Sequence, residues 1–164
     1  MSWKSDAADW CERQEHEGKK ASALQRKAFA LGQVSVTVEK SGVGWYITPE
    51  NFRIALIETL KRANIFGDDR AKAVVIEARI VKATFPSGGF EMTSDLSVHY
   101  QVRRTDGTVL LDEDVSYQGR ATISEEFFGS AIALLAFQRG NEGHFGILLP
   151  KIRNALARGD SSAK

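Results

Sequence analysis

The sequence has 164 residues, of which 43% are hydrophobic and 26% are charged, as expected for a single globular domain with an ordinary polar surface. Its 22 Lys and Arg residues nearly balance 21 Asp and Glu residues, so it lacks the cationic surplus with which nucleic-acid-binding proteins displace phosphate counterions. A single cysteine, Cys11, excludes an intrachain disulfide and a thiolate metal cluster.

Residues 1–30 are rich in charge, and their few apolar residues do not form a broad helix face. We expect this N-terminal arm to be helical or mobile and only loosely docked on the body of the protein. Residues 1–20 are too polar for a signal peptide, and no run approaches the ~18 apolar residues of a membrane-spanning helix. The chain is therefore expected to be cytoplasmic, or a mature fragment whose signal was removed.

The next two elements are a strand and a helix. A half-buried strand is predicted over residues 33–40, where three valines alternate with small polar side chains. The segment 48–66 predicts a helix: Thr48 can cap its first turn, Pro49 suits its first position, and Gly67 suits its end. Its apolar residues recur at steps of three and four: Phe52, Ala55, Leu56, Leu60 and Ala63. Such a helix needs a sheet or another helix beneath it.

Three long strands are predicted after this helix, over residues 72–83, 92–104 and 108–121. In each of them apolar residues alternate with polar ones, which is typical of a sheet with one buried and one solvated face. The first connection is residues 85–90, and the second contains the hairpin signal Asp106-Gly107, because Gly accepts positive φ. The pattern therefore predicts an antiparallel meander.

The segment 122–158 has the pattern of a long helix with a broad apolar face. Pro150 is expected to kink or restart this helix, because proline removes a backbone hydrogen bond. Together the elements predict an α+β fold, a two-layer sandwich in which two helices cover one face of an antiparallel sheet of about four strands. We expect this domain to span residues 31–158 and to end in a disordered tail, 159–164.

The sequence offers no constellation of reactive side chains. His16, His99 and His144 lie in different elements, without the spacing of metal ligands, and His99 is expected to face solvent. The acidic residues 112–114 alternate between two strand faces, so they do not converge as the ligands of a calcium loop would. We therefore predict no catalytic residue, no metal site and no cofactor, and we expect that the protein is not an enzyme.

Five large apolar residues are candidates for a binding surface. Trp45 and Tyr46 stand at the entry of the first helix, and Phe85, Phe90 and Met92 lie in or beside the first hairpin connection. Large apolar side chains in loops can mark a binding edge. They can equally close the core at the end of the sheet, so both interpretations remain open.

Several segments carry a family resemblance. They are PENFRIALIETLKRANIF at 49–66, MTSDLSVHYQV at 92–102, DGTVLLDEDV at 106–115 and FFGSAIALLAFQRGNEGHFGILLPKI at 127–152. In order and pattern they resemble small bacterial cell-envelope lipoproteins of unassigned function. More distantly, they are similar to the auxiliary lipoproteins of envelope ABC transporters and to the lipopolysaccharide-assembly lipoprotein.

The resemblance implies a periplasmic or outer-membrane-associated domain with a helix-backed sheet, usually anchored through a lipidated N-terminal cysteine. Cys11 follows Asp9-Trp10 and lacks the small residues of a lipidation site, so membrane association would depend on a removed signal that carried the anchor.

The leading hypothesis is a non-catalytic envelope binding or assembly module for lipid or a protein partner. The alternative is a small-ligand-binding domain or enzyme in which, as in cystatin-like folds, a helix wraps a curved sheet around a pocket. A third is a homodimer through the open sheet face, which includes Val75 and Val81. No nucleic-acid partner is expected.

Overall fold

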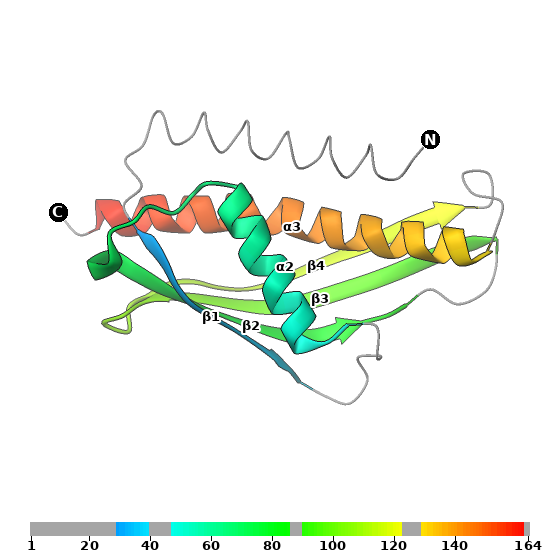
Figure 1. The fold of residues 1–164 in the computed structure, drawn as a ribbon, viewed down its shortest axis with the longest axis horizontal. Coiled ribbons are helices and arrows are strands. Elements are labelled where there is room, and N and C mark those ends of the chain that lie inside the picture. Colours follow the sequence, from blue (N-terminus) through cyan, green and yellow to red (C-terminus); the bar gives the residue numbers. More distant parts are fainter. Residues whose placement is uncertain (1–28, 40–46, 86–89, 123–128, 163–164) are drawn as a thin grey trace.

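A computed structural model of the protein describes residues 29–39, 47–85, 90–122 and 129–162 (Figure 1). These residues confirm the α+β fold, with a four-stranded sheet covered by two helices. The elements in chain order are β1 (Ala30–Val38), α2 (Pro49–Arg62), the 3-10 turn η1 (Arg70–Lys72), β2 (Ala73–Ala83), β3 (Glu91–Arg104), β4 (Val109–Thr122) and α3 (Gly129–Ser161). No helix of the described chain is long and apolar enough to cross a membrane.

The sheet has the order β1-β2-β3-β4 and is mixed rather than wholly antiparallel. The three later strands form the predicted antiparallel meander. The first strand instead pairs parallel with β2, because α2 carries the chain back to the end of the sheet at which β1 began. A β-bulge interrupts this pairing between Leu31 and Val34, after which the register is regular to Val38.

Both helices lie on the same face of the sheet, where α2 packs on β1 and α3 packs on β3 and β4 (Figure 1). The burial of β3 alternates strictly between Met92 and Val102, with the apolar side chains under the helices, as predicted. The main core includes the fully buried side chains of Leu56, Leu60 and Tyr100. A smaller second cluster fills the end of the molecule where β3 begins; it consists of Met92, Ala121, Ile132, Ala133 and Ala136.

The start of α2 is as predicted, but its end is not. Thr48 caps the first turn, since its Oγ1 accepts a hydrogen bond of 3.1 Å from the backbone N–H of Asn51. The helix stops at Arg62, and Asn64, with φ of 54°, takes the left-handed conformation that was expected at Gly67. Gly67 instead donates a backbone hydrogen bond of 2.8 Å to Phe29, beside the start of β1.

The last helix runs unbroken through Pro150, so the predicted restart of the helix at this residue is wrong. Pro150 is exposed, so water can reach the carbonyl that its missing N–H leaves unbonded. Glycines bring this helix unusually close to the sheet: a Cβ on Gly119 of β4 would overlap the α3 backbone at Ala136 and Gly140. A Cβ on Gly143 would overlap the ring of Tyr117.

Candidate functional site

Aromatic side chains are exposed towards the end of the sandwich where β3 begins, which lies beyond the end of β2 (right-hand end of Figure 1). The Phe90 side chain is 79% exposed and that of Phe85 is 39% exposed. The Phe85 ring lies 5.7 Å, centroid to centroid, from the ring of Phe137 on α3, and the exposed Leu134 is one helical turn away. We call these four residues, Phe85, Phe90, Leu134 and Phe137, the end patch.

The end patch exists because β3 and β4 run past the end of β2. Glu91 and Met92 pair with β4 but not with β2 in the described ladders. This overhanging ribbon is covered by the first turns of α3, and the second cluster fills the space between them. Met92 is buried in that cluster, so it closes the core, whereas Phe90 two residues earlier faces outward. The other two predicted binding residues, Trp45 and Tyr46, lie outside the described residues.

The face of the sheet opposite the helices is covered by polar side chains that bond to one another across the strands. His99 is half-buried there, as the outward-facing position predicted: its Nδ1 lies 2.7 Å from an oxygen of Asp114 and its Nε2 lies 2.9 Å from an oxygen of Asp112. Further pairs are Glu77 with Arg103, Lys82 with Asp95, Ser97 with Ser116, and Gln101 with Asp112. Exposed pairs of this kind are worth ~0–1 kcal/mol each, so they solvate the face more than they stabilise it.

A buried polar pair crosses the core. The Nε2 atom of His144 on α3 lies 2.8 Å from the hydroxyl of Tyr100 on β3, and both side chains are fully buried. Burial lowers the pKa of His144 to about 4 and raises the pKa of Tyr100 well above its usual value. The rings of Phe52 and Phe145 enclose the imidazole. The contact between His144 and Tyr100 fastens α3 to the sheet.

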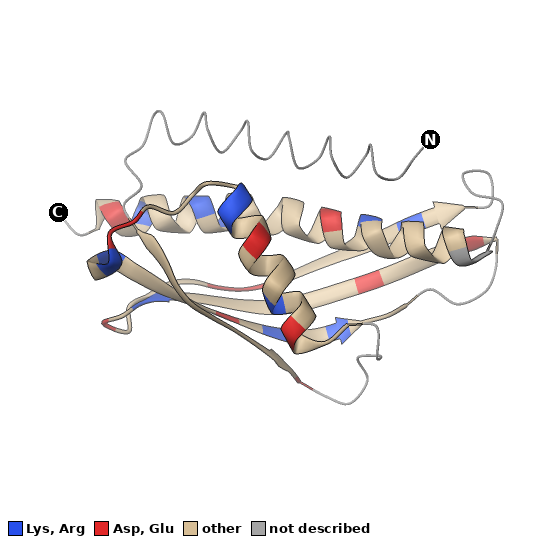
Figure 2. Ribbon diagram, viewed as in Figure 1, with Lys and Arg blue, Asp and Glu red and all other residues tan. Residues whose placement is uncertain are grey.

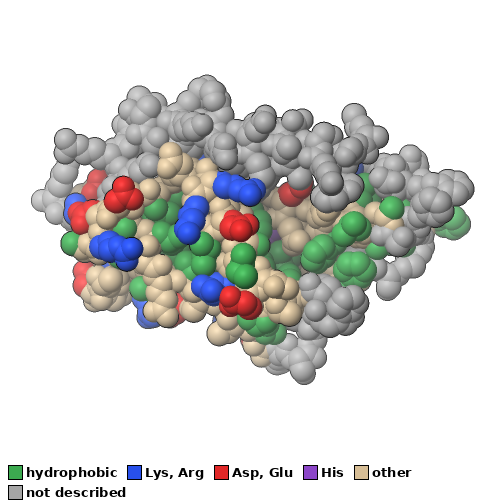
Figure 3. Space-filling model, viewed as in Figure 1, with side chains coloured by type: hydrophobic (Ala, Val, Ile, Leu, Met, Phe, Trp, Pro, Cys, Tyr) green, Lys and Arg blue, Asp and Glu red, His purple; other side chains and the backbone are tan. Residues whose placement is uncertain are grey.

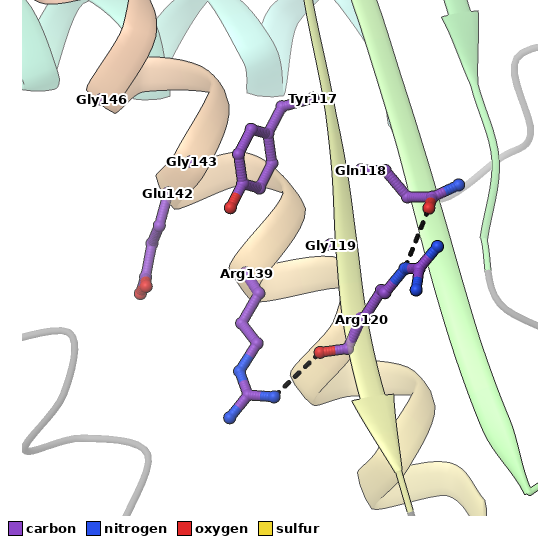
Figure 4. Close-up of a pocket in the computed structure, with 8 residues that line it drawn as sticks. All are labelled: Tyr117, Gln118, Gly119, Arg120, Arg139, Glu142, Gly143 and Gly146. Carbon is purple, nitrogen blue, oxygen red and sulfur yellow. Dashed lines mark hydrogen bonds between the residues drawn. The ribbon is translucent and has the colours of Figure 1, made fainter.

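A hollow of about 450 Å³ lies between the outer edge of β4 and α3 (Figure 4). Two arginines in it bond to nearby groups: Arg139 donates to the backbone oxygen of Arg120 at 2.8 Å, and Arg120 donates to the side chain of Gln118 at 3.1 Å. The Tyr117 ring lies against the helix at Gly143. The contacts of Arg139 and Tyr117 attach α3 to the edge strand, whereas the bond between Arg120 and Gln118 lies within β4.

The largest described hollow, about 720 Å³, runs between the N-terminal half of β1 and the C-terminal half of α2. Leu31, Val34 and Ile57 give it an apolar lining, and its charged lining residues are Lys61, Asp68 and Arg70. On this face hydrophobic side chains emerge between the charged residues of α2, where acids and bases are interspersed (Figures 2 and 3).

Solved structures of bacterial proteins are similar to this chain. Protein XCC0632 of Xanthomonas campestris, matched by the family model DUF330, has a TM-score of 0.54 at 10% identity over 82% of this chain and 96% of its own. A lipoprotein candidate of Caulobacter crescentus has a TM-score of 0.44 at 14% identity, over 80% of this chain and 92% of its own. The minor lipoprotein of Acinetobacter baumannii has a TM-score of 0.41 at 10% identity, over 80% and 95%.

No protein-family model and no curated protein matches the sequence. At these identities the likeness to XCC0632 establishes a shared fold.

Proposed function

We propose that this protein is a non-catalytic binding module of the bacterial cell envelope, and that the end patch binds lipid acyl chains. The observation that carries the proposal is the exposure of Phe90, together with the exposure of Phe85, whose ring packs against Phe137. A phenyl ring left in water forgoes ~2 kcal/mol that burial would supply. Clustered aromatic exposure at one end of a domain is typical of a surface that a partner covers.

Lipid is favoured over a protein partner by the shape and surroundings of the end patch. The Phe90 ring projects from the end of an overhanging ribbon, so it can enter a hydrocarbon layer without burying the rest of the domain. Lys82 and Arg120, which flank this end, each pair with an acid, Asp95 and Glu91 respectively. Attraction to anionic headgroups is therefore weak, and we expect the apolar contact to supply most of the affinity.

The cell envelope is proposed from the sequence resemblance to small envelope lipoproteins. The helix-backed sheet shared with XCC0632 agrees with the fold that this resemblance implies. A periplasmic location, an anchor supplied by a lipidated N-terminus and a role related to transporter-auxiliary or lipopolysaccharide-assembly lipoproteins belong to the same proposal.

An enclosed cystatin-like pocket beneath the middle of α2 has little room among the described residues. The space beneath α2 is filled by Leu56 and Leu60, and neighbouring Tyr100 is also fully buried. The hollows described above lie at the two edges of the sheet, one between β4 and α3 and the other between β1 and the C-terminal half of α2.

Vesicle co-sedimentation tests the lipid proposal. The wild type should sediment with phosphatidylethanolamine–phosphatidylglycerol vesicles, and Phe90→Ser should weaken binding by about 30-fold if the ring is fully inserted, which corresponds to ~2 kcal/mol. Val109→Ser is the matched control, because Val109 is 50% exposed at the opposite end of the β3–β4 hairpin. Equal loss of vesicle binding in both variants, or no vesicle binding by the wild type, would contradict the proposal. Co-purification of a second protein with the wild type would instead favour a protein partner.

A further inference from the structure

The two edges of the sheet differ in their protection against further strand pairing. Proteins commonly protect an exposed edge with charged residues, proline or a bulge. The edge strand β4 carries four charged residues: Asp112, Glu113, Asp114 and Arg120. The edge strand β1, Ala30–Val38, carries none and has no proline. Its only protection of this kind is the bulge between Leu31 and Val34.

The C-terminal part of β1 is therefore a regular and uncharged edge. From Val34 to Val38 it pairs in continuous register with Ile76–Ile80 of β2 on its inner side. On its outer side, the bridge found within the described chain joins Ala30 to Gly67, before the bulge. Beyond that bridge, the described residues leave outward backbone N–H and C=O groups of β1 without a strand partner, and such groups direct strand addition.

We propose that β1 pairs antiparallel with β1 of a second copy of this chain, joining two four-stranded sheets into one continuous sheet. A two-fold axis perpendicular to the sheet keeps the faces of both strands in common. Val34 and Val36, which face the helices, then meet valines, while Ser35 and Thr37 meet each other on the open face. The alternating pattern of β1 is therefore complementary to β1 of a second copy, whereas an unrelated strand need not match it.

The hollow beside β1 offers apolar surface to the second copy. Antiparallel pairing brings the C-terminal end of the second copy's strand alongside the N-terminal half of β1, where the hollow of about 720 Å³ lies. Val38 of the second copy then meets an apolar lining that includes Leu31.

Sedimentation velocity and native mass spectrometry on the full chain test this dimer. The wild type should be dimeric, and Ser35→Lys/Thr37→Lys should be monomeric, because like charges then oppose each other across the two-fold axis. The matched control is Ser116→Lys/Gln118→Lys, which makes the same charge change on exposed positions of the other edge strand. This control should remain dimeric.

A charge exchange keeps the test informative if a variant folds poorly. Ser35→Glu/Thr37→Glu should also be monomeric, and an equimolar mixture of the Lys and Glu variants should restore the dimer as a heterodimer. Far-UV circular dichroism reports whether each variant is folded. A monomeric wild type, a dimer that survives both charge variants, or a mixture of folded variants that fails to associate would overturn the proposal. Vesicle binding through the end patch is measured separately, so the two proposals stand or fall independently.

Discussion

Acidification should destabilise this protein through His144, whose ring is fully buried against Tyr100. Burial lowers the pKa of His144 to about 4, whereas in the unfolded chain the ring titrates near its ordinary value of 6.5. The unfolded state therefore takes up the proton first. The stability contributed by the neutral ring is complete above the unfolded pKa and is lost as the pH falls from 6.5 towards 4.

The linkage relation gives the magnitude. With these two pKa values the free energy of unfolding should fall by ~2 kcal/mol at about pH 5 and by ~3 kcal/mol at about pH 4, relative to neutral pH. The assay is urea unfolding of the wild type and of His144→Gln across this range. The glutamine amide can still bond to Tyr100 and does not titrate, so the variant should lack this component of the pH dependence.

Carboxyl groups also destabilise the fold in acid, and the paired measurement separates them. The hydrogen bond from Lys82 lowers the pKa of Asp95, and the backbone N–H of Thr108 lowers the pKa of Asp106. Their stabilisation is present at neutral pH and is lost as the pH falls, equally in both proteins. The difference in unfolding free energy between the two proteins should therefore change by ~3 kcal/mol between about pH 7 and pH 4. Parallel stability curves would refute the assignment of a neutral, buried imidazole.

Four further substitutions probe the framework. Gly119→Ala should lower the free energy of unfolding in urea by ~1–3 kcal/mol, because its Cβ overlaps the α3 backbone. Gly146→Ala has open space around its Cβ, so it should raise the free energy of unfolding by up to ~1 kcal/mol. Equal effects of the two substitutions would contradict the close contact at Gly119. Thr48→Ala should cost ~1 kcal/mol in thermal unfolding through loss of the cap on α2, and an unchanged melting temperature would exclude that role. Pro150→Ala should stabilise the protein by ~1–3 kcal/mol, since the residue is exposed inside a helix; destabilisation would mean that the ring itself packs.

Local patterns were sufficient for much of the fold. Alternation correctly assigned the buried and open faces of β3, and Thr48 with Pro49 correctly located the start of α2. The end of this helix was missed because Asn64 takes the left-handed conformation, which asparagine adopts more often than most residues other than glycine. The parallel direction of β1 was not predicted either, because it depends on which strand β1 joins after the helix, and no local pattern records that.

Some polar contacts could likewise be predicted from the sequence, and others could not. The pairing of His99 with Asp114 was within reach of the sequence, because a register counted back from the turn at Asp106 and Gly107 places the two opposite each other. The contact of His144 with Tyr100 was not, since it depends on how α3 is rotated over the sheet. The exposure of Phe90 beside buried Met92 likewise depends on the overhang of one ribbon beyond its neighbour, which strand lengths alone define poorly.

The glycine contact between β4 and α3 has a mechanical consequence. Where backbone rests on backbone, no flexible side chain is available to absorb sliding or rotation of the helix, so α3 and the ribbon below it should move as one body. Leu134 and Phe137 are carried by that helix, while Phe85 and Phe90 are carried by the strand ends. The two halves of the end patch should therefore keep a fixed geometry in the unbound protein. Little conformational entropy then remains to be lost when the end patch binds a hydrocarbon surface.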